Sequence, residues 1–269
     1  MEQRERPLLL LSNDDGFDAT GIRVLTDILR DLGDIIVVAP DGGRSGSSLS
    51  ITGTIPVKYN KEHEESGKII DGKEVGSLTV YSCSGTPCDC VKMALEFLLP
   101  RRPDIVIGGI NHGDNAATNA HYSGTIGIAI EGTLKEIPSV GFSSCAFSGI
   151  ADFKRLAEPI REIVSMVLAN GLPDKVFLNV NFPSCKQFKG MKICRMGMGD
   201  WIDEWIERDH PRGGKYFWIA GSFKSYDGDD PDTDIWALDN GYVAITPITL
   251  DFTAYSAFDF LKEKLLIEE

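Results

Sequence analysis

Runs of apolar residues alternate along this chain with segments whose apolar residues recur at helical spacing. Residues 8–11 are four consecutive leucines, and residues 34–39 contain a second apolar run. Both runs are predicted to be strands buried on both faces of a sheet. Between them, residues 21–32 carry apolar side chains at the spacing of an amphipathic helix. This order of strand, helix and strand predicts parallel pairing through a right-handed crossover.

The same alternation continues through the first half of the chain. Thr86 and Pro87 are predicted to open a helix, because threonine is a favoured N-cap and proline suits the first helical position. A strand that ends in glycines follows at 103–109, then a helix at 124–135 and a strand at 138–142. These elements predict an α/β fold, a Rossmann-like three-layer sandwich around a mostly parallel, doubly wound sheet.

The other segments have weaker patterns. Residues 51–59 and 77–83 are predicted strands, joined by an exposed loop or hairpin end at 60–74. A helix is expected within 153–168, where Pro159 marks either a kink or the start of the helix. Further elements are expected as strands at 176–180, 191–196 and 242–247 and as a terminal helix at 258–267.

The segment that begins at residue 199 differs in character from the rest of the chain. It holds all four tryptophans, a Pro-Arg-Gly-Gly turn and an acidic run. This composition predicts an extended arm or hairpin rather than a further layer of the sandwich. We therefore expect one domain over 1–269, with a core at 1–198, an arm at 199–251 used in oligomerisation, and a C-terminal helix at 252–269.

Charge restricts the partners that this protein can bind. The formal net charge is −13, which argues against duplex nucleic acid or an anionic membrane as the main partner, since both require a basic face. No apolar run approaches the roughly 20 residues of a membrane span, and residues 1–6 lack the apolar core of a signal peptide. We therefore expect a cytoplasmic protein whose six cysteines are reduced thiols.

Loops rich in polar oxygen atoms follow three of the predicted strands. Because the carboxyl ends of parallel strands meet at one edge of a sheet, these loops are expected to converge on one pocket. Two adjacent carboxylates at such an edge repel each other, and a hard divalent cation with oxygen ligands relieves the repulsion. The alternative is that these residues only form turns, in which their side chains accept hydrogen bonds from backbone N–H groups. The loops supply Asn13, Asp14 and Asp15, then Ser45, then Asn111, His112, Asp114 and Asn115.

A fourth segment has the pattern of an anion site. Ser123 lies where a long loop becomes a helix, so that Gly124 and Thr125 have free backbone N–H groups there. Unpaired N–H groups at a helix N-terminus bind phosphate. The alternative is that Ser123 is an ordinary helix cap.

Together these motifs resemble the SurE (survival protein E) family of metal-dependent 5′-nucleotidases. The resemblance covers most of the chain in family order, and it is weakest over residues 199–225. The motifs that carry it are Ser12-Asn13-Asp14-Asp15-Gly16, Val38-Ala39-Pro40-Asp41 with Arg44-Ser45, Ser84-Gly85-Thr86-Pro87, Gly109-Ile110-Asn111-x-Gly113-x-Asn115, Tyr122-Ser123-Gly124-Thr125, and Asp232-Thr233-Asp234-x-Trp236-Ala237.

The resemblance implies a cofactor, a substrate class and an assembly. The substrates would be nucleoside 5′-monophosphates, and the chain would form a homodimer or homotetramer in which the C-terminal arm is exchanged. One divalent cation per subunit, Mg²⁺ or Mn²⁺, would be held with water by Asp14, Asp15, Ser45 and Asn111.

The expected chemistry is metal-assisted hydrolysis of a phosphomonoester. Asp14 and Asp15 are the catalytic candidates, because they would anchor the cation and accept a proton from the attacking water. Two alternatives stay open. One is a phosphatase that forms an aspartyl-phosphate, although its Asp-x-Asp spacing differs from the adjacent aspartates here. The other is a nucleotide-sensing binding module, which needs no cation. The candidates for binding phosphate or substrate are Asn111, Asn115, Ser123, Gly124 and Thr125.

Overall fold

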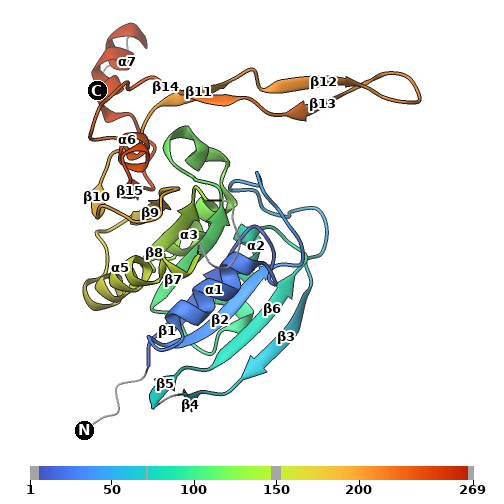
Figure 1. Cartoon of the computed structure of the whole chain (residues 1–269), viewed down its shortest axis with the longest axis vertical. Helices are drawn as coiled ribbons and strands as arrows, with labels where there is room; N and C mark the ends of the chain where they lie inside the picture. The colour runs from blue at the N-terminus through green and yellow to red at the C-terminus, as the bar shows by residue number, and fades with distance from the viewer. Residues whose placement is uncertain (1–5, 71, 147–152, 266–269) are drawn as a thin grey trace.

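The computed structural model describes residues 6–70, 72–146 and 153–265. Within these residues, nine strands form one sheet in the order β10-β15-β9-β8-β7-β1-β2-β6-β3 (Figure 1). The strands from β9 to β6 run parallel to one another, whereas β3 at one edge and the β15–β10 pair at the other run in the opposite direction. The strands are β1 (Leu8–Ser12), β2 (Asp34–Pro40), β3 (Tyr59–Glu65), β6 (Leu78–Cys83), β7 (Ile105–His112), β8 (Ser139–Ser144), β9 (Val176–Phe182), β10 (Met191–Ile193) and β15 (Val243–Thr249).

The run of leucines forms the centre of this sheet. Every residue of β1 is buried. Leu9 and Leu11 pack into the core on one face of the sheet, and Leu8 and Leu10 pack into the core on the other. Because successive side chains of a strand point to opposite faces, a strand covered on both sides needs an unbroken apolar run. The prediction of a mostly parallel α/β sheet is confirmed.

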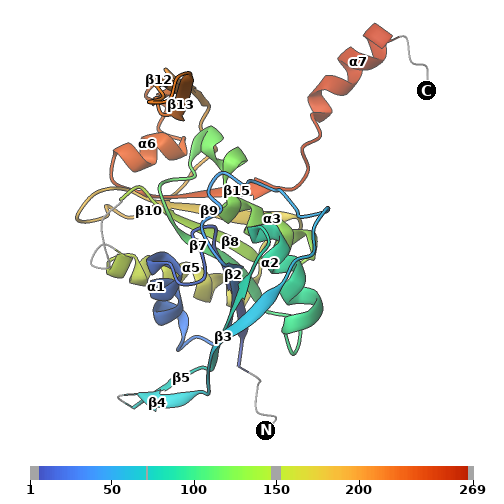
Figure 2. The same ribbon diagram turned by 90° about the vertical axis from the view of Figure 1, so that its right-hand side faces the viewer.

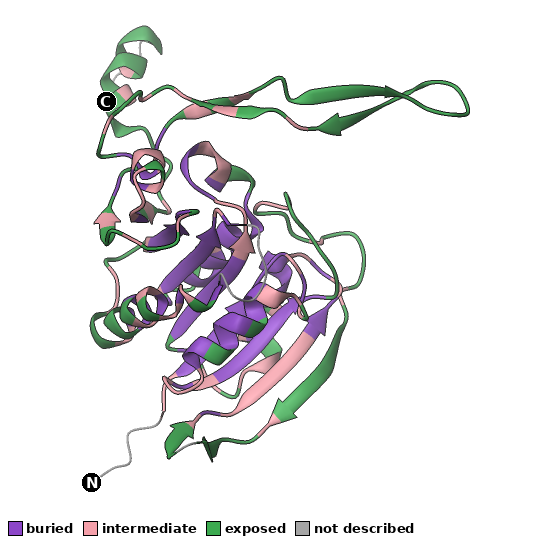
Figure 3. Ribbon diagram, viewed as in Figure 1, coloured by how far each residue is buried: buried purple, intermediate pink, exposed green. Residues whose placement is uncertain are grey.

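Helices cover both faces of the sheet and make the three layers (Figures 1 and 2). One face carries α1 (Thr20–Leu29) and α5 (Ala157–Asn170), and the other carries α2 (Pro87–Met93), its π-helical continuation η1 (Ala94–Leu98) and α3 (Gly124–Leu134). Figure 3 shows the buried residues concentrated in the central strands and on the inner faces of these helices. Thr86 accepts a hydrogen bond from the Asp89 N–H, and Asp89 accepts one from the Thr86 N–H. This capping box confirms the predicted start of α2.

The order of strands places a topological switch point beside β1. The chain proceeds from β1 through β2 to β6 on one side, and then returns through β7 to β8 and β9 on the other. Open α/β sheets bind ligands at the carboxyl ends of the strands where the order reverses. The loops after β1, β2 and β7 therefore lie at this point.

Several predicted boundaries differ from the structure. No strand occurs at 51–58. The polar segment expected to be an exposed loop or hairpin end contains most of β3 and then a small hairpin of β4 (Lys68–Ile70) and β5 (Lys73–Val75). The helix that contains Pro159 begins two residues before it, so the proline lies in the first turn without a kink. The strand predicted at 191–196 is β10 and ends at Ile193.

The arm is an extended hairpin that projects from the body (Figure 1). Its inner part pairs β11 (Gly199–Ile202) with β14 (Ser222–Ser225), and its outer part pairs β12 (Trp205–Asp209) with β13 (Lys215–Ile219). The predicted arm segment 199–251 also included α6 (Asp234–Asp239) and β15, but these return to the body, where β15 joins the sheet.

The chain leaves the body again after β15. It forms a short turn, η3 (Tyr255–Ala257), and the exposed helix α7 (Phe258–Leu265). Residues 266–269, part of the predicted terminal helix, lie outside the described residues, as do residues 1–5. In the described part of the chain, none of the helices is both long and apolar enough to cross a membrane.

Candidate active site

The predicted loops meet in one cavity at the carboxyl end of the sheet. This cavity of about 310 Å³ is lined by Asp14 after β1, Ser45 after β2 and Asn111 at the end of β7. Asn115 and Ser123 line the same cavity. Residues far apart in the sequence are therefore brought together, as expected for loops that follow the carboxyl ends of parallel strands. Larger cavities exist elsewhere on the molecule, but they do not contain these residues.

The turn after β1 holds Asp14 in a fixed position. The Asn13 side chain donates to the Gly16 carbonyl and accepts from the Gly16 N–H, which closes the turn. Gly16 has a φ of +112°, a backbone conformation that favours glycine. The Asp14 carboxylate accepts a hydrogen bond of 2.8 Å from the Thr125 hydroxyl of α3. Asp14 is thereby held between the central strand and a helix start.

Burial disfavours the charged form of both carboxylates. Asp14 is only 4% exposed, and burial raises its pKa to about 6; the Thr125 hydrogen bond opposes this rise and the charge of Asp15 adds to it. Burial also raises the pKa of Asp15, while the charge and the backbone N–H of His112 oppose the change. Neither carboxylate forms an ion pair with a lysine or arginine of the described residues.

These two carboxylates fit a divalent cation. Asp15 Oδ2 is buried and has no hydrogen-bond partner within the described chain, which leaves an oxygen available as a ligand. In the described residues there is no group of three His, Cys, Asp or Glu side chains placed for a metal. The oxygen set here contains only two carboxylates, completed by a hydroxyl at Ser45 and an amide at Asn111, and such oxygens are what Mg²⁺ and Mn²⁺ prefer.

The end of β7 directs the Asn111 side chain. Its amide nitrogen donates to the Gly113 carbonyl at 2.9 Å, so its carbonyl oxygen is the atom left for a ligand. The pairing of β7 with β8 shifts register between Gly108 and Asn111. Such an irregularity changes the direction of the strand end at the site.

The start of α3 supports part of the predicted anion site. Ser123 is the N-cap, because its hydroxyl accepts from the Ile126 N–H. The Thr125 side chain is fully buried and donates to Asp14, so its hydroxyl is committed to the carboxylate rather than to a ligand. The backbone N–H groups of Gly124 and Thr125 belong to the first turn, where no helical carbonyl can accept them.

Three further features complete the site. Ser47 Oγ is buried without a partner in the described structure and lies beside Gly124. Asn115 is held by its backbone N–H, which donates to Asn181, and by its side chain, which donates to Ser143. Asn179 completes this buried network by donating to the Asn115 carbonyl. The strand predicted at 176–180 includes Asn179 and ends one residue before Asn181. The alternation Asn179-x-Asn181 was the available signal, since both side chains lie on one face of a strand.

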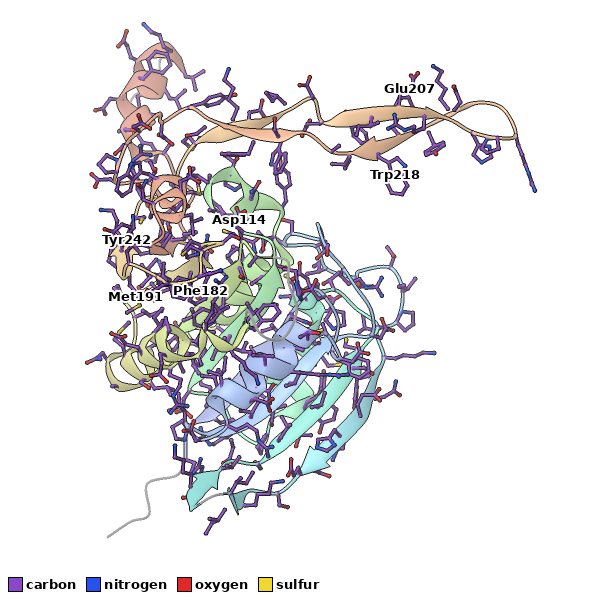
Figure 4. The ribbon with its side chains drawn as sticks, viewed as in Figure 1. Asp114, Phe182, Met191, Glu207, Trp218 and Tyr242 are labelled. Carbon is purple, nitrogen blue, oxygen red and sulfur yellow. The ribbon has the colours of Figure 1, made fainter. Side chains whose placement is uncertain are left out.

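The third feature is a contribution from the arm. Trp201 of β11 lines the cavity together with Asp14 and Asn111. Asp234, fully buried at the start of α6, accepts from the N–H groups of Ala117 and Gly197. Asp234 thus joins the base of the arm to the loop beside the cavity. Figure 4 shows Asp114, which also lines the cavity, at the end of the sheet that faces the arm.

Comparison with known proteins agrees with this geometry. The family model described as "Survival protein SurE" matches residues 9–203. The chain belongs to the SurE family. It is 53% identical to "5'-nucleotidase SurE" of Phocaeicola vulgatus over 97% of each chain, and 49% identical to the protein of the same name from Bacteroides thetaiotaomicron over 96% of each chain. The crystal structure of the Sure protein from Aquifex aeolicus is 35% identical, with a TM-score of 0.77, and the match covers 96% of this chain and 100% of that one.

Proposed function

We propose that this chain is a divalent-metal-dependent phosphomonoesterase that hydrolyses nucleoside 5′-monophosphates to nucleosides and phosphate. One observation carries the proposal. Asp14, which is buried, and Asp15, which is half-buried, are adjacent at the switch point without an ion pair to a lysine or arginine of the described residues, and Asp14 lines a cavity shared with the start of α3. The names of the relatives from P. vulgatus and B. thetaiotaomicron, "5'-nucleotidase SurE", support the same reaction and substrate class.

Four side chains would hold the cation, with Mg²⁺ and Mn²⁺ the proposed ions. A bound divalent cation supplies neutralisation of phosphate charge and lowers the pKa of a coordinated water. Asp15 Oδ2, which has no partner among the described residues, is free to bind the cation. The hydrogen bond from Thr125 fixes the orientation of the Asp14 carboxylate toward the proposed cation site. The proposed ligands are Asp14, Asp15, Ser45 and Asn111.

The phosphate would be oriented by α3. The N–H groups of Gly124 and Thr125 and the positive end of the helix dipole favour an anion there. The Ser123 and Ser47 hydroxyls lie beside this helix start, and Asn115 lines the same cavity. These donors would stabilise the charge of the transferring phosphoryl group by position rather than by covalent chemistry.

Phosphate release tests the proposed reaction directly. With Mn²⁺ present, the purified chain is expected to release inorganic phosphate from 5′-AMP and 5′-GMP, and an excess of EDTA is expected to abolish the release. Restoring Mn²⁺ should restore it. Tight nucleotide binding without phosphate release from any phosphomonoester would contradict the proposal and favour a nucleotide sensor. A trapped phosphorylated aspartate would contradict the proposed direct attack by water.

We further propose a single SurE domain over 1–269 that forms a homodimer or homotetramer through its arm. A two-stranded ribbon is only marginally stable alone in water. The ribbon of β12 and β13 also carries exposed apolar side chains, which a partner surface would remove from water. Trp205 is 62% exposed, Trp218 63% and Ile219 74%. Figure 4 shows Trp218 on the outer part of the arm, away from the body. A second copy of the chain would cover these side chains.

Shortening the arm tests the proposed assembly. Ile202 and Ser222 are the last pair at the outer end of the β11–β14 ladder, so replacing residues 203–221 with Asn-Gly should close a two-residue turn there. We expect the dimer or tetramer to become a monomer in light scattering after size-exclusion chromatography. An unchanged assembly would show that the arm is not the interface.

The proposed compartment is the cytoplasm. Cys83, Cys88 and Cys90 are buried as free thiols, which is the state that a reducing compartment maintains.

A further inference from the structure

We propose that Trp201 forms the surface on which the nucleobase of the substrate stacks, and that Asn119 positions its indole ring. This inference rests on the proposed function and specifies how the same cavity recognises more than phosphate. It is drawn from the contacts at the base of the arm, in the part of the chain where the sequence resembles the family least.

The lining of the cavity has two chemically different parts. Asp14, Asn111 and Ser123 form an end that suits a cation and a phosphate. Trp201, which reaches the same cavity from β11, contributes a large flat aromatic ring. Phosphate alone gains nothing from such a ring, whereas a planar heterocycle attached to the phosphate through a ribose can stack on it.

Hydrogen bonds and packing hold the indole of Trp201 in place. Its Nε1–H donates to Asn119 Oδ1 at 2.7 Å. The Asn119 amide in turn donates to Asp114 Oδ1 at 3.2 Å. The Phe223 ring packs against the indole in a T-shaped arrangement, with ring centroids 6.1 Å apart. A side chain held on both sides loses little conformational entropy when a ligand stacks on it.

The base of the arm is also joined to the loop that forms the cavity wall. The Thr118 hydroxyl donates to the Gly199 carbonyl at 3.1 Å. Asp234 accepts from Ala117 on that loop and from Gly197 just before the arm. The ring is therefore fixed relative to the loop that carries Asn119, rather than free to move with the outer arm.

The indole N–H is already used by Asn119, and this limits the kind of recognition. The ring offers its aromatic surface and no further hydrogen-bond donor. Stacking tolerates any base, because every base has an aromatic face. We therefore infer that Trp201 favours substrates with a base over substrates without one, and does not by itself select one base.

The test compares two substrates that share a phosphate and a ribose. The measured quantity is kcat/KM for 5′-AMP divided by kcat/KM for ribose 5-phosphate, with Mn²⁺ present. Trp201→Ala is expected to lower this ratio roughly tenfold to a hundredfold, mainly through a higher KM for 5′-AMP. Trp201→Phe, which keeps an aromatic face, should recover most of the ratio. Tyr226→Ala is the matched control, since Tyr226 is an exposed aromatic side chain at the base of the arm and does not line the cavity.

A double-mutant cycle tests the positioning role of Asn119. Asn119→Ala is expected to lower the ratio in the unaltered background and to have no further effect in the Trp201→Phe background, where the indole N–H is absent. An equal loss in both backgrounds would show that Asn119 does not act through Trp201. A Trp201→Ala ratio within twofold of the unaltered chain would overturn the stacking proposal. If the unaltered chain hydrolyses neither substrate, the proposed function itself fails.

Discussion

Replacing Asp14 with asparagine is expected to lower kcat/KM for 5′-AMP by roughly a thousandfold with Mn²⁺ present. Asparagine has nearly the same shape and can still accept the hydrogen bond from Thr125, which measures 2.8 Å in this structure. The substitution therefore removes one negative charge from the proposed ligand set and little else. Initial rates of phosphate release and a Mn²⁺ binding isotherm measure the two consequences separately.

The fold of the Asp14→Asn variant should be intact, because the substitution removes a charge that is costly to bury. Urea unfolding of the metal-free variant at pH 7.5 should give a free energy of unfolding equal to or above that of the unaltered chain. Asp18→Asn is the matched control, since Asp18 lies in the same loop but is exposed. Full turnover of Asp14→Asn at saturating Mn²⁺ would show that Asp14 does not anchor the cation.

Mn²⁺ binding is expected to weaken steeply in mild acid. Burial raises the pKa of Asp14 to about 6 in the metal-free protein, and a cation must displace the proton that the carboxylate holds below that pH. Protonation of Asp14 should therefore raise the dissociation constant for Mn²⁺ roughly tenfold for each pH unit below about 6. Above pH 7 Asp14 is ionised, and it should change this constant little. Calorimetric titration with Mn²⁺ between pH 5 and 8 measures this dependence.

The same pKa predicts how the stability of the metal-free protein varies with pH. The pKa of Asp14 is raised from 3.8 to about 6, so the folded state holds the proton more tightly than the unfolded state. Tighter proton binding by Asp14 stabilises the folded state fully below pH 3.8, and this stabilisation is lost as the pH rises through about 6. The loss in the free energy of unfolding amounts to about 3 kcal/mol. Mn²⁺ should restore stability at pH 7.5. A dissociation constant that stays level from pH 5 to 8 would contradict both expectations.

The centre of the fold was predictable because burial on both faces leaves a strong pattern in the sequence. The leucine run of β1 and the capping box of α2 both follow from local residues. The edge strand β3 was missed, since its residues are almost all exposed and polar. Such a strand is held mainly by backbone hydrogen bonds to β6, which any sequence can make.

The sequence by itself determined which loops supply the candidate site, because a parallel sheet brings the carboxyl ends of its strands to one edge. Asp14, Ser45 and Asn111 were predicted to meet for that reason, and they line one cavity. Only the tertiary structure decided that Thr125 binds Asp14 and that Trp201 reaches the cavity. Such contacts join residues distant in the chain, and they depend on how helix and arm are placed on the sheet, which no local pattern specifies.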